Sequence, residues 1–244
     1  MTSSHDTDAD VPQSHSVLVF DVNETLLDIT ALEPFFARVF GDPRVLREWF
    51  GQLVTYSMTV TLAGVYTDFF SLGQAVLKML ADIHGVQLTE DDVAAVRTDF
   101  SAMPAHGDVA EGLGLLRDMG YRLVTLTNSP KSQSGSTPLQ RAGLGRFFEH
   151  EFSVDPARVF KPAPQLYRDV ARQLGVPPSA CLMVAAHVWD TIGAQAAGFG
   201  GALIRREGNA PLPAPGVPSP TVEAADLIEL ARRLDGPASG ASTG

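Results

Sequence analysis

The chain has 244 residues, of which 45% are hydrophobic, and it carries a formal net charge of -10 with a pI near 4.9. This length is enough for one large domain or for a core domain that carries an insertion. The acidic balance, without clustered Lys and Arg, argues against a nucleic-acid surface, so we expect no DNA or RNA partner. A single cysteine, Cys181, excludes an intrachain disulfide and a multi-cysteine zinc site, which fits a cytoplasmic protein.

The predicted elements begin after a polar, acidic stretch, residues 1–15, which we interpret as a disordered tail without a secretory signal. The apolar run "SVLVF" then predicts a buried strand. From residue 29 to about residue 103 the strand signal disappears, and helical periodicity predicts successive helices over 43–64, 67–85 and 89–103. Thr89 is the expected N-cap of the last of these, with Asp92 three residues on. A helical insertion directly after a first strand predicts a cap over a sheet.

Strand and helix patterns alternate in the second half of the chain, in the runs "DVAEGLGLLRDMG", "YRLVTLT", "PQLYRDVARQLG", "CLMVAA", "AQAAGFG" and "GALIRR". This alternation is typical of an α/β fold with a parallel sheet. The window from "CLMVAA" to "GALI" is long and apolar, but it contains His187 and Asp190, which would be costly in a bilayer, so we expect no membrane partner. The stretch "GNAPLPAPGVPSPT" predicts a surface loop, and residues 236–244 predict a disordered tail.

Polar side chains lie in four places in the sequence at which a predicted strand ends or is connected to the next element. In an open parallel sheet, ligands bind outside the carboxyl ends of the strands, so these side chains are candidates for one site. Each also has an ordinary structural explanation, as a helix cap, a turn residue or, for the lysine, a surface side chain beside a proline. The candidates are Asp21, which ends the first strand; Thr127, Asn128 and Ser129; Lys161; and His187 and Asp190.

The order of the motifs "FDVNET", "LTNS", "FKPAPQLY" and "VAAHVWD" resembles the haloacid dehalogenase superfamily, and the "KP" and "WD" details are most similar to type II 2-haloacid dehalogenases. The resemblance covers roughly residues 16–234. It implies a Rossmann-like, doubly wound parallel sheet as the core, formed by residues 16–30 and 104–235, with an inserted all-helical cap domain at residues 31–103.

Two residues distinguish this chain from the phosphatases of the superfamily that it resembles. Those enzymes carry a second Asp as general acid two residues after the first, and a magnesium-binding Asp four residues before the last one. Here these positions are Asn23 and Ala186. Asn cannot protonate a leaving alkoxide as a carboxylic acid can, and Ala offers no oxygen to a hard cation. A halide leaves without a proton, so we expect a reaction without metal or other cofactor.

The resemblance implies hydrolysis of the carbon–halogen bond of a short 2-haloacid. Asp21 would displace the halide to form an aspartyl ester, which water would then hydrolyse, giving a 2-hydroxyacid. Lys161 would pair with Asp21 and hold it ionised. Thr25 would bond Asp21, although a role as a turn cap stays open, and Asp190 would orient the water or hold Lys161, although it could also be a helix N-cap.

For the substrate carboxylate we expect the Thr127 hydroxyl and the backbone N–H groups of Val22 and Asn23, because charge-assisted bonds to a fixed anion supply orientation. Asn128 matches the halide-side residue that the resemblance implies, and a turn-forming role remains an alternative. Tyr167 matches the type II pattern, but it also shares an apolar helix face, so a packing role is equally open.

The chain departs from the type II pattern at two places. Trp49 stands where those enzymes have an arginine that cradles the halide; Arg47 could serve after a small shift, or it could be a solvated helix residue. His187 stands where they have an asparagine, with Ala185 in place of a serine. His187 could position or deprotonate the water, or it could be structural.

Three classes of function therefore remain open. The leading one is a metal-independent dehalogenase acting on a small 2-haloacid and water. The alternatives are a magnesium-dependent phosphatase of the same superfamily and a protein that binds small carboxylates without dehalogenating them. The apolar stretch "TYSMTVTLAGVYTDFF" could form a homodimer face, and burial under the cap explains it equally well.

Overall fold

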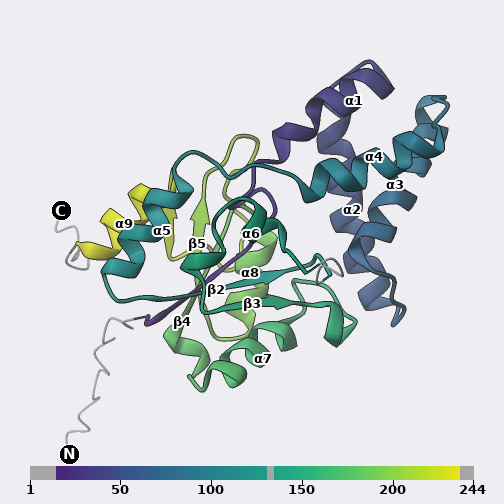
Figure 1. The fold of residues 1–244 in the computed structure, drawn as a ribbon. Coiled ribbons are helices and arrows are strands. Elements are labelled where there is room, and N and C mark those ends of the chain that lie inside the picture. Colours follow the sequence, from purple (N-terminus) through teal and green to yellow (C-terminus); the bar gives the residue numbers. More distant parts are fainter. Residues whose placement is uncertain (1–14, 131–134, 237–244) are drawn as a thin grey trace, which may run out of the picture.

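A computed structural model describes residues 15–130 and 135–236 and shows an α/β fold built on one six-stranded parallel sheet (Figure 1). The strand order is β3-β2-β1-β4-β5-β6, with β1 paired to β2 on one side and to β4 on the other. The chain thus reverses its winding direction at β1, which makes the carboxyl end of β1 a topological switch point, the usual place for a ligand. The strands are β1 (Val17–Phe20), β2 (Arg122–Thr127), β3 (His150–Ser153), β4 (Cys181–Ala185), β5 (Gly200–Ile204) and β6 (Val222–Ala224).

The two central strands are buried along their whole length, which explains why both are continuous apolar runs in the sequence. The outer strands β3 and β6 carry partly exposed or polar residues, and sequence reasoning missed both because edge strands lack that pattern. Helices α5 and α9 pack together, as do α7 and α8, and the sheet lies between the two pairs (Figure 1). These and the short helix between β2 and β3 are α5 (Val109–Asp118), α6 (Pro138–Arg141), α7 (Pro164–Leu174), α8 (Val188–Ala196) and α9 (Leu227–Asp235).

Four helices separate β1 from α5 and form a group beside the sheet (Figure 1). Thr89 caps the last of them in a reciprocal capping box with Asp92, which confirms the predicted cap. The first of them was not predicted as a separate helix. The helices are α1 (Glu33–Phe40), α2 (Val45–Leu62), α3 (Phe69–His84) and α4 (Glu90–Ser101), preceded by the 3-10 turn η1 (Ile29–Leu32).

The two segments that connect this helical group to the sheet lie side by side. The Asp28 N–H donates to Pro104 O at 2.8 Å, and the His106 N–H donates to Leu26 O at 3.0 Å. Both connections leave and re-enter the core near the carboxyl end of β1. The helical group is therefore anchored next to the sheet edge where the polar residues gather.

Of the predicted tails, residues 1–14 and 237–244 lie outside the described residues. The segment 205–221 contains no helix or strand, as the sequence predicted for most of it. No helix in the described parts of the chain combines the length and apolar character needed to cross a bilayer.

Candidate active site

Asp21 lies directly after β1, and its carboxylate accepts bonds from two buried side chains. Lys161 Nζ donates to Oδ1 at 2.8 Å, and Thr25 Oγ1 donates to Oδ2 at 2.7 Å. Burial alone would raise the pKa of Asp21, but the charge of Lys161, together with His187, holds it far below its ordinary value. Asp21 is therefore a fixed, ionised carboxylate at the switch point of the sheet.

Lys161 is fully buried in the loop before α7, and three acceptors surround its ammonium group. Besides Asp21, it donates to Asp190 Oδ2 at 2.6 Å and to Leu126 O at 2.9 Å. Burial lowers the lysine pKa, but the charges of Asp190 and Asp21 outweigh it and raise the pKa. The alternative of a surface lysine is wrong, because this side chain has no exposed area.

The approach of α8 to the loop that carries Lys161 depends on a glycine. A Cβ atom at Gly193 would lie 2.5 Å from the carbonyl oxygen of Pro162, which no side chain could tolerate. The same helix carries Asp190 in its first turn. Close packing at Gly193 thus lets the carboxylate reach the lysine.

Asp190 is completely buried, and its second oxygen accepts a hydrogen bond from the Tyr167 hydroxyl. Burial, the strongest influence, raises the pKa of Asp190, and the neighbouring Asp21 charge acts in the same direction against Lys161. Tyr167 lies on α7 with no exposed area, and its ring meets Phe199 edge to face. In this arrangement Tyr167 orients Asp190 rather than facing open space.

Thr25 links two segments of the site. Its hydroxyl donates to Asp21 and accepts from the Ala186 N–H at 2.8 Å, at the end of β4. Of the two roles left open by the sequence, bonding Asp21 is the one present. Because this hydroxyl joins the ends of β1 and β4, Thr25 fixes the orientation of the Asp21 carboxylate.

The predicted substrate-binding residues lie at the adjacent strand end. Thr127, Val22 and Asn23 line a hollow of about 430 Å³ that extends beneath α6. Asn128 uses its side-chain oxygen to accept from the Lys161 N–H at 3.0 Å. The Asn23 amide donates to Ser129 Oγ at 3.2 Å. The carbonyl side of Asn128 is thus structural, and the hollow borders the two residues that follow Asp21, but not Asp21 itself.

His187 lies between two carboxylates and is almost fully buried. Its Nε2 is 2.7 Å from Glu24 Oε2, and its Nδ1 is 3.5 Å from Asp21 Oδ2, with no hydrogen-bond partner within the described chain. Burial lowers the pKa of His187, but the bonds and charges of Asp21 and Glu24 together raise it to about 9. The imidazole is stacked on Trp189 and borders Phe50 of α2.

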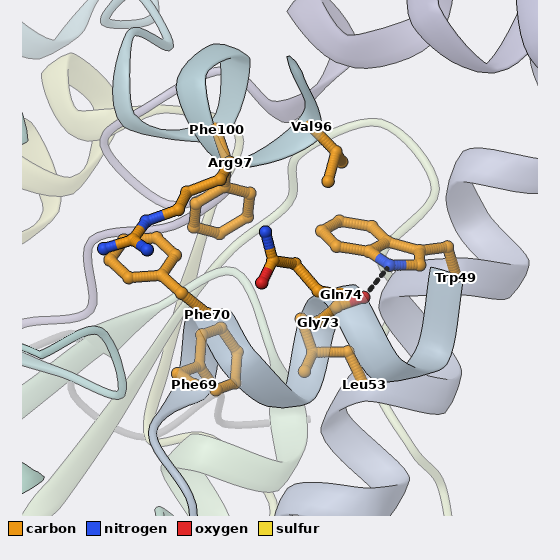
Figure 2. A pocket seen from close by; sticks show the side chains of 9 residues that line it. All are labelled: Trp49, Leu53, Phe69, Phe70, Gly73, Gln74, Val96, Arg97 and Phe100. Atoms are coloured by element: carbon orange, nitrogen blue, oxygen red, sulfur yellow. Dashed lines mark hydrogen bonds between the residues drawn. The ribbon is translucent and has the colours of Figure 1, made fainter. Parts of the chain in front are cut away.

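The structure separates the two residues proposed for the halide cradle. Trp49 points into the helical group, where its indole N–H donates to Gly73 O at 2.9 Å (Figure 2). Its ring packs on Phe36 and Phe100. The assignment of Trp49 to the substrate site is therefore wrong in this geometry, because burial in the apolar core of the helices is where a large aromatic side chain is most stable. Arg47, two residues earlier and on another face of α2, instead pairs with Glu24.

Sequence reasoning missed Glu24 and Asn209 as site residues. Glu24 is buried despite its charge, and Asn209 Nδ2 donates to its Oε1 at 3.0 Å. Glu24 had one detectable signal, a charged residue inside the tight connection after the first strand. Asn209 lies in a loop of the segment 205–221, and no local pattern marks it.

The comparisons with known proteins agree with this geometry. A family model for haloacid dehalogenase-like hydrolases matches residues 15–198. The chain belongs to this family. It is 30% identical to (S)-2-haloacid dehalogenase 1 of Pseudomonas sp. (strain CBS-3) over 77% of this chain and 83% of that protein.

Solved haloacid dehalogenases share the fold of this family member. The L-2-haloacid dehalogenase of Xanthobacter autotrophicus, solved with chloropropionic acid covalently bound, is 25% identical and superposes with a TM-score of 0.81, covering 92% of this chain and 100% of that one. Another L-2-haloacid dehalogenase structure, 28% identical, reaches a TM-score of 0.85 over 91% of this chain and all of its own. The Rossmann-like α/β fold predicted from the sequence is confirmed.

In this dehalogenase-like hydrolase, the ammonium group of Lys161 lies between the acids of the first and last motifs, Asp21 and Asp190. Within residues 15–130 and 135–236, no group of three or more His, Cys, Asp or Glu side chains is arranged to hold a metal ion. The side chains around Asp21 are suited to holding its carboxylate ionised and in a fixed orientation, with the His187 imidazole beside it.

Proposed function

We propose that the protein hydrolyses the carbon–halogen bond of short 2-haloacids through an ester on Asp21. The observation that carries this proposal is the buried, ionised Asp21 carboxylate, held by Lys161 and Thr25, with the unpartnered His187 Nδ1 3.5 Å from one of its oxygens. The relatives named as (S)-2-haloacid dehalogenases support the substrate class.

The first step is a displacement at C2 of the haloacid. An oxygen of Asp21 forms a bond to C2, and the halide leaves with the electron pair of the broken bond, without a proton. A carboxylate is a weak nucleophile, so orientation and exclusion of water supply most of the acceleration, of which about 7–11 kcal/mol is available from positioning. Lys161 and Thr25 fix the attacking group, and the backbone N–H groups of Val22 and Asn23 with Thr127 would hold the substrate carboxylate.

The halide leaves on the side of C2 opposite the attacking oxygen. His187 lies beside Asp21, so this residue is badly placed to receive the halide and well placed for the next step. We propose that helices α1–α4 act as a cap and that α2 covers the side of the site on which His187 lies. Phe50 of this helix already borders the His187 ring, at 5.5 Å between centroids.

The second step is hydrolysis of the ester. Formation of the ester removes the negative charge of Asp21, one of the two carboxylates that hold the His187 pKa near 9. The pKa of His187 therefore falls when a base is needed. His187 Nδ1 takes a proton from water, and the hydroxide adds to the Asp21 carbonyl carbon. Of Lys161 and Thr25, the one that bonds the remaining carbonyl oxygen of Asp21 stabilises the oxyanion.

Collapse of this adduct breaks the bond between the Asp21 carbonyl carbon and the Asp21 oxygen that is joined to C2, so the product keeps that oxygen and Asp21 gains one from water. The leaving alkoxide takes the proton from His187 and becomes the 2-hydroxyacid. Asp21 is regenerated as a carboxylic acid and loses its proton, since its pKa in this environment is far below neutral. The balance is one water consumed, with one halide and one proton released.

A magnesium-dependent phosphatase reaction is less well supported. Asn23 cannot act as the acid that such a reaction needs, and its amide is already bonded to Ser129. Ala186 contributes its backbone N–H to Thr25 and has no side-chain oxygen for a cation. The family relatives named above are dehalogenases.

The test is halide release from L- and D-2-chloropropionate and from chloroacetate, with a metal chelator present. We expect release from at least one substrate, unchanged by the chelator, and none from the Asp21→Asn variant. Release that requires added magnesium, or phosphate release from an aryl phosphate, would favour the phosphatase instead. Binding of small carboxylates without any turnover would favour a non-catalytic family member.

We further propose a cytoplasmic location and a homodimer. The lone Cys181 is buried, and burial raises its pKa to about 11, so its thiol is unreactive and fits a reducing compartment. Leu62, Val65 and Ile83 expose large apolar side chains at the helical group and could be covered by a second copy. The molar mass in solution, measured by light scattering, tests the dimer.

A further inference from the structure

The residue after Asn23, Glu24, has a backbone conformation that its neighbours must stabilise. Its φ angle is +67°, in the left-handed region that non-glycine residues seldom adopt. Its N–H donates to Leu27 O at 2.9 Å, and its carbonyl oxygen lies 3.1 Å from His106 Nε2. A buried acid in such a conformation persists where the surrounding structure holds it, and such residues gather at functional sites.

Each oxygen of the Glu24 carboxylate has its own partners. Oε2 lies 2.7 Å from His187 Nε2, on the side of the site. Oε1 accepts bonds from Arg47 Nη1 and from Asn209 Nδ2, on the side away from Asp21. The carboxylate is thus fixed from both sides, and rotation about its last bond would break all three contacts.

The residues that hold Oε1 come from parts of the chain that lie far apart in sequence. Arg47 is in the first turns of α2, in the helical group, and Asn209 is in the connection between β5 and β6. Arg47 also donates from Nη2 to Glu207 O at 2.8 Å, in that same connection. One arginine therefore ties the helical group to the loop and to the acid that contacts His187.

We propose that Arg47 and Asn209 are positioning residues for the hydrolysis of the aspartyl ester: by holding Glu24 Oε1 they direct Oε2 to His187, so that the docking of α2 completes the water-activating pair. This inference rests on the proposed dehalogenase reaction and adds to it a link between the cap and the second step. It also assigns Arg47 a role other than that of a halide ligand.

The two chemical steps should respond differently to loss of these contacts. Formation of the ester uses Asp21, Lys161 and the substrate-orienting groups. Among the described residues, no hydrogen bond or ion pair joins these groups to Arg47 or Asn209. Hydrolysis needs His187 Nδ1 directed at the water, and the orientation of the ring depends on the bond between its Nε2 and Glu24. Misplacement of a catalytic group by about 1 Å can lower a rate about a hundredfold.

The experiment follows a single turnover of L-2-chloropropionate by rapid quench, with halide release reporting ester formation and the mass of the intact protein reporting the ester. We expect Arg47→Ala and Asn209→Ala to form the ester at the wild-type rate and to hydrolyse it about ten to a hundred times more slowly, so that the adduct accumulates. Arg47→Lys, which keeps one cationic donor, should recover part of the loss.

The matched control is Arg44→Ala, a highly exposed arginine at the start of the same helix whose partner is Asp42. This variant should behave as the wild type in both steps. A second control uses Glu24→Gly. Glycine adopts the left-handed backbone conformation of this position without strain, and the change removes the carboxylate that Arg47, Asn209 and His187 share. In that background Arg47→Ala should have no further effect on hydrolysis.

Three results would overturn the inference. The first is that Arg47→Ala slows ester formation and ester hydrolysis equally. The second is that Arg47→Ala slows only ester formation, which would make Arg47 a halide ligand. The third is that Arg47→Ala slows hydrolysis as much in the Glu24→Gly background as in the wild type. Failure of the proposed reaction itself would look different, because the wild-type protein would then release no halide and form no adduct.

Discussion

His187 Nε2 lies 2.7 Å from Glu24 Oε2, and both side chains are almost fully buried. A histidine and a carboxylate in this arrangement form a base whose orientation is set by the acid, as in other nucleophile-activating arrangements. In the proposed reaction the nucleophile to be activated is water. The proposal therefore gives the two half-reactions to different groups: the displacement to Asp21 with Lys161, and the hydrolysis to His187 with Glu24.

The first prediction concerns His187. The variant His187→Gln keeps a polar side chain but has no group that can act as a base near neutral pH. We expect ester formation to continue and hydrolysis to slow by about 10²–10⁴, the usual contribution of a general base. One equivalent of halide per protein, together with an adduct in the mass spectrum, would be the expected result. Full turnover by this variant would show that another group activates the water.

The second prediction concerns pH. The His187 pKa is raised in the folded protein to about 9, from an ordinary value of 6.5. Protonation therefore favours the folded state, and this stabilisation is complete below pH 6.5 and is lost as the pH rises through about 9. We expect the difference in free energy of unfolding between wild type and His187→Gln, measured in urea, to shrink from pH 6 to pH 10.

A difference that grows toward alkaline pH would contradict the raised pKa. Subtracting the unfolding free energy of His187→Gln from that of the wild type removes the contributions of other groups that titrate in the same range. One such group is His106, whose pKa is lowered by burial. The measurement at each pH therefore reports on the contacts of His187 with its two carboxylates.

The third prediction concerns Lys161. Its replacement by Met leaves Asp21 and Asp190 buried without the ammonium group that lies between them. Breaking a buried ion pair in this way costs about 3–5 kcal/mol of unfolding free energy. We expect a loss of that size in urea denaturation and no halide release. Lys78→Met, at an exposed position on α3, is the control and should change stability by less than about 0.5 kcal/mol.

The fourth prediction concerns Trp49. Trp49→Arg introduces the residue type that the similar enzymes carry there. It places a charge beside Leu53 and Phe100 (Figure 2) and beside Phe36, in the apolar interior of the helices. We expect a loss of at least about 3 kcal/mol in unfolding free energy and no gain in dehalogenation rate. Trp49→Phe, which removes mainly the bond to Gly73, should cost only about 1–2 kcal/mol.

A stable Trp49→Arg variant with faster halide release would mean that this position can turn toward Asp21. Unfolding in urea and halide release, measured on the same preparations, distinguish the two outcomes.

The local patterns of the sequence determined the fold class and pointed to the proposed nucleophile. β1 and β4 are buried on both faces, so their residues must be continuously apolar, and such runs are visible without a structure. Asp21 was visible because it interrupts such a run at a strand end. The helices between residues 43 and 103 and the cap at Thr89 were equally local, since helical periodicity and capping depend on residues within a few positions of each other.

Only the tertiary structure decided which polar side chains act together. The bonds of Lys161 to Asp21 and Asp190 span 140 and 29 positions, and the bonds of Glu24 to His187 and Asn209 span 163 and 185. The positions of the Trp49 and Arg47 side chains, one in the interior of the helices and the other paired with Glu24, depend on which face of α2 is buried against the other helices. A sequence pattern shows that a residue is polar or apolar, but the partner that satisfies a buried charge comes from the packing of distant segments.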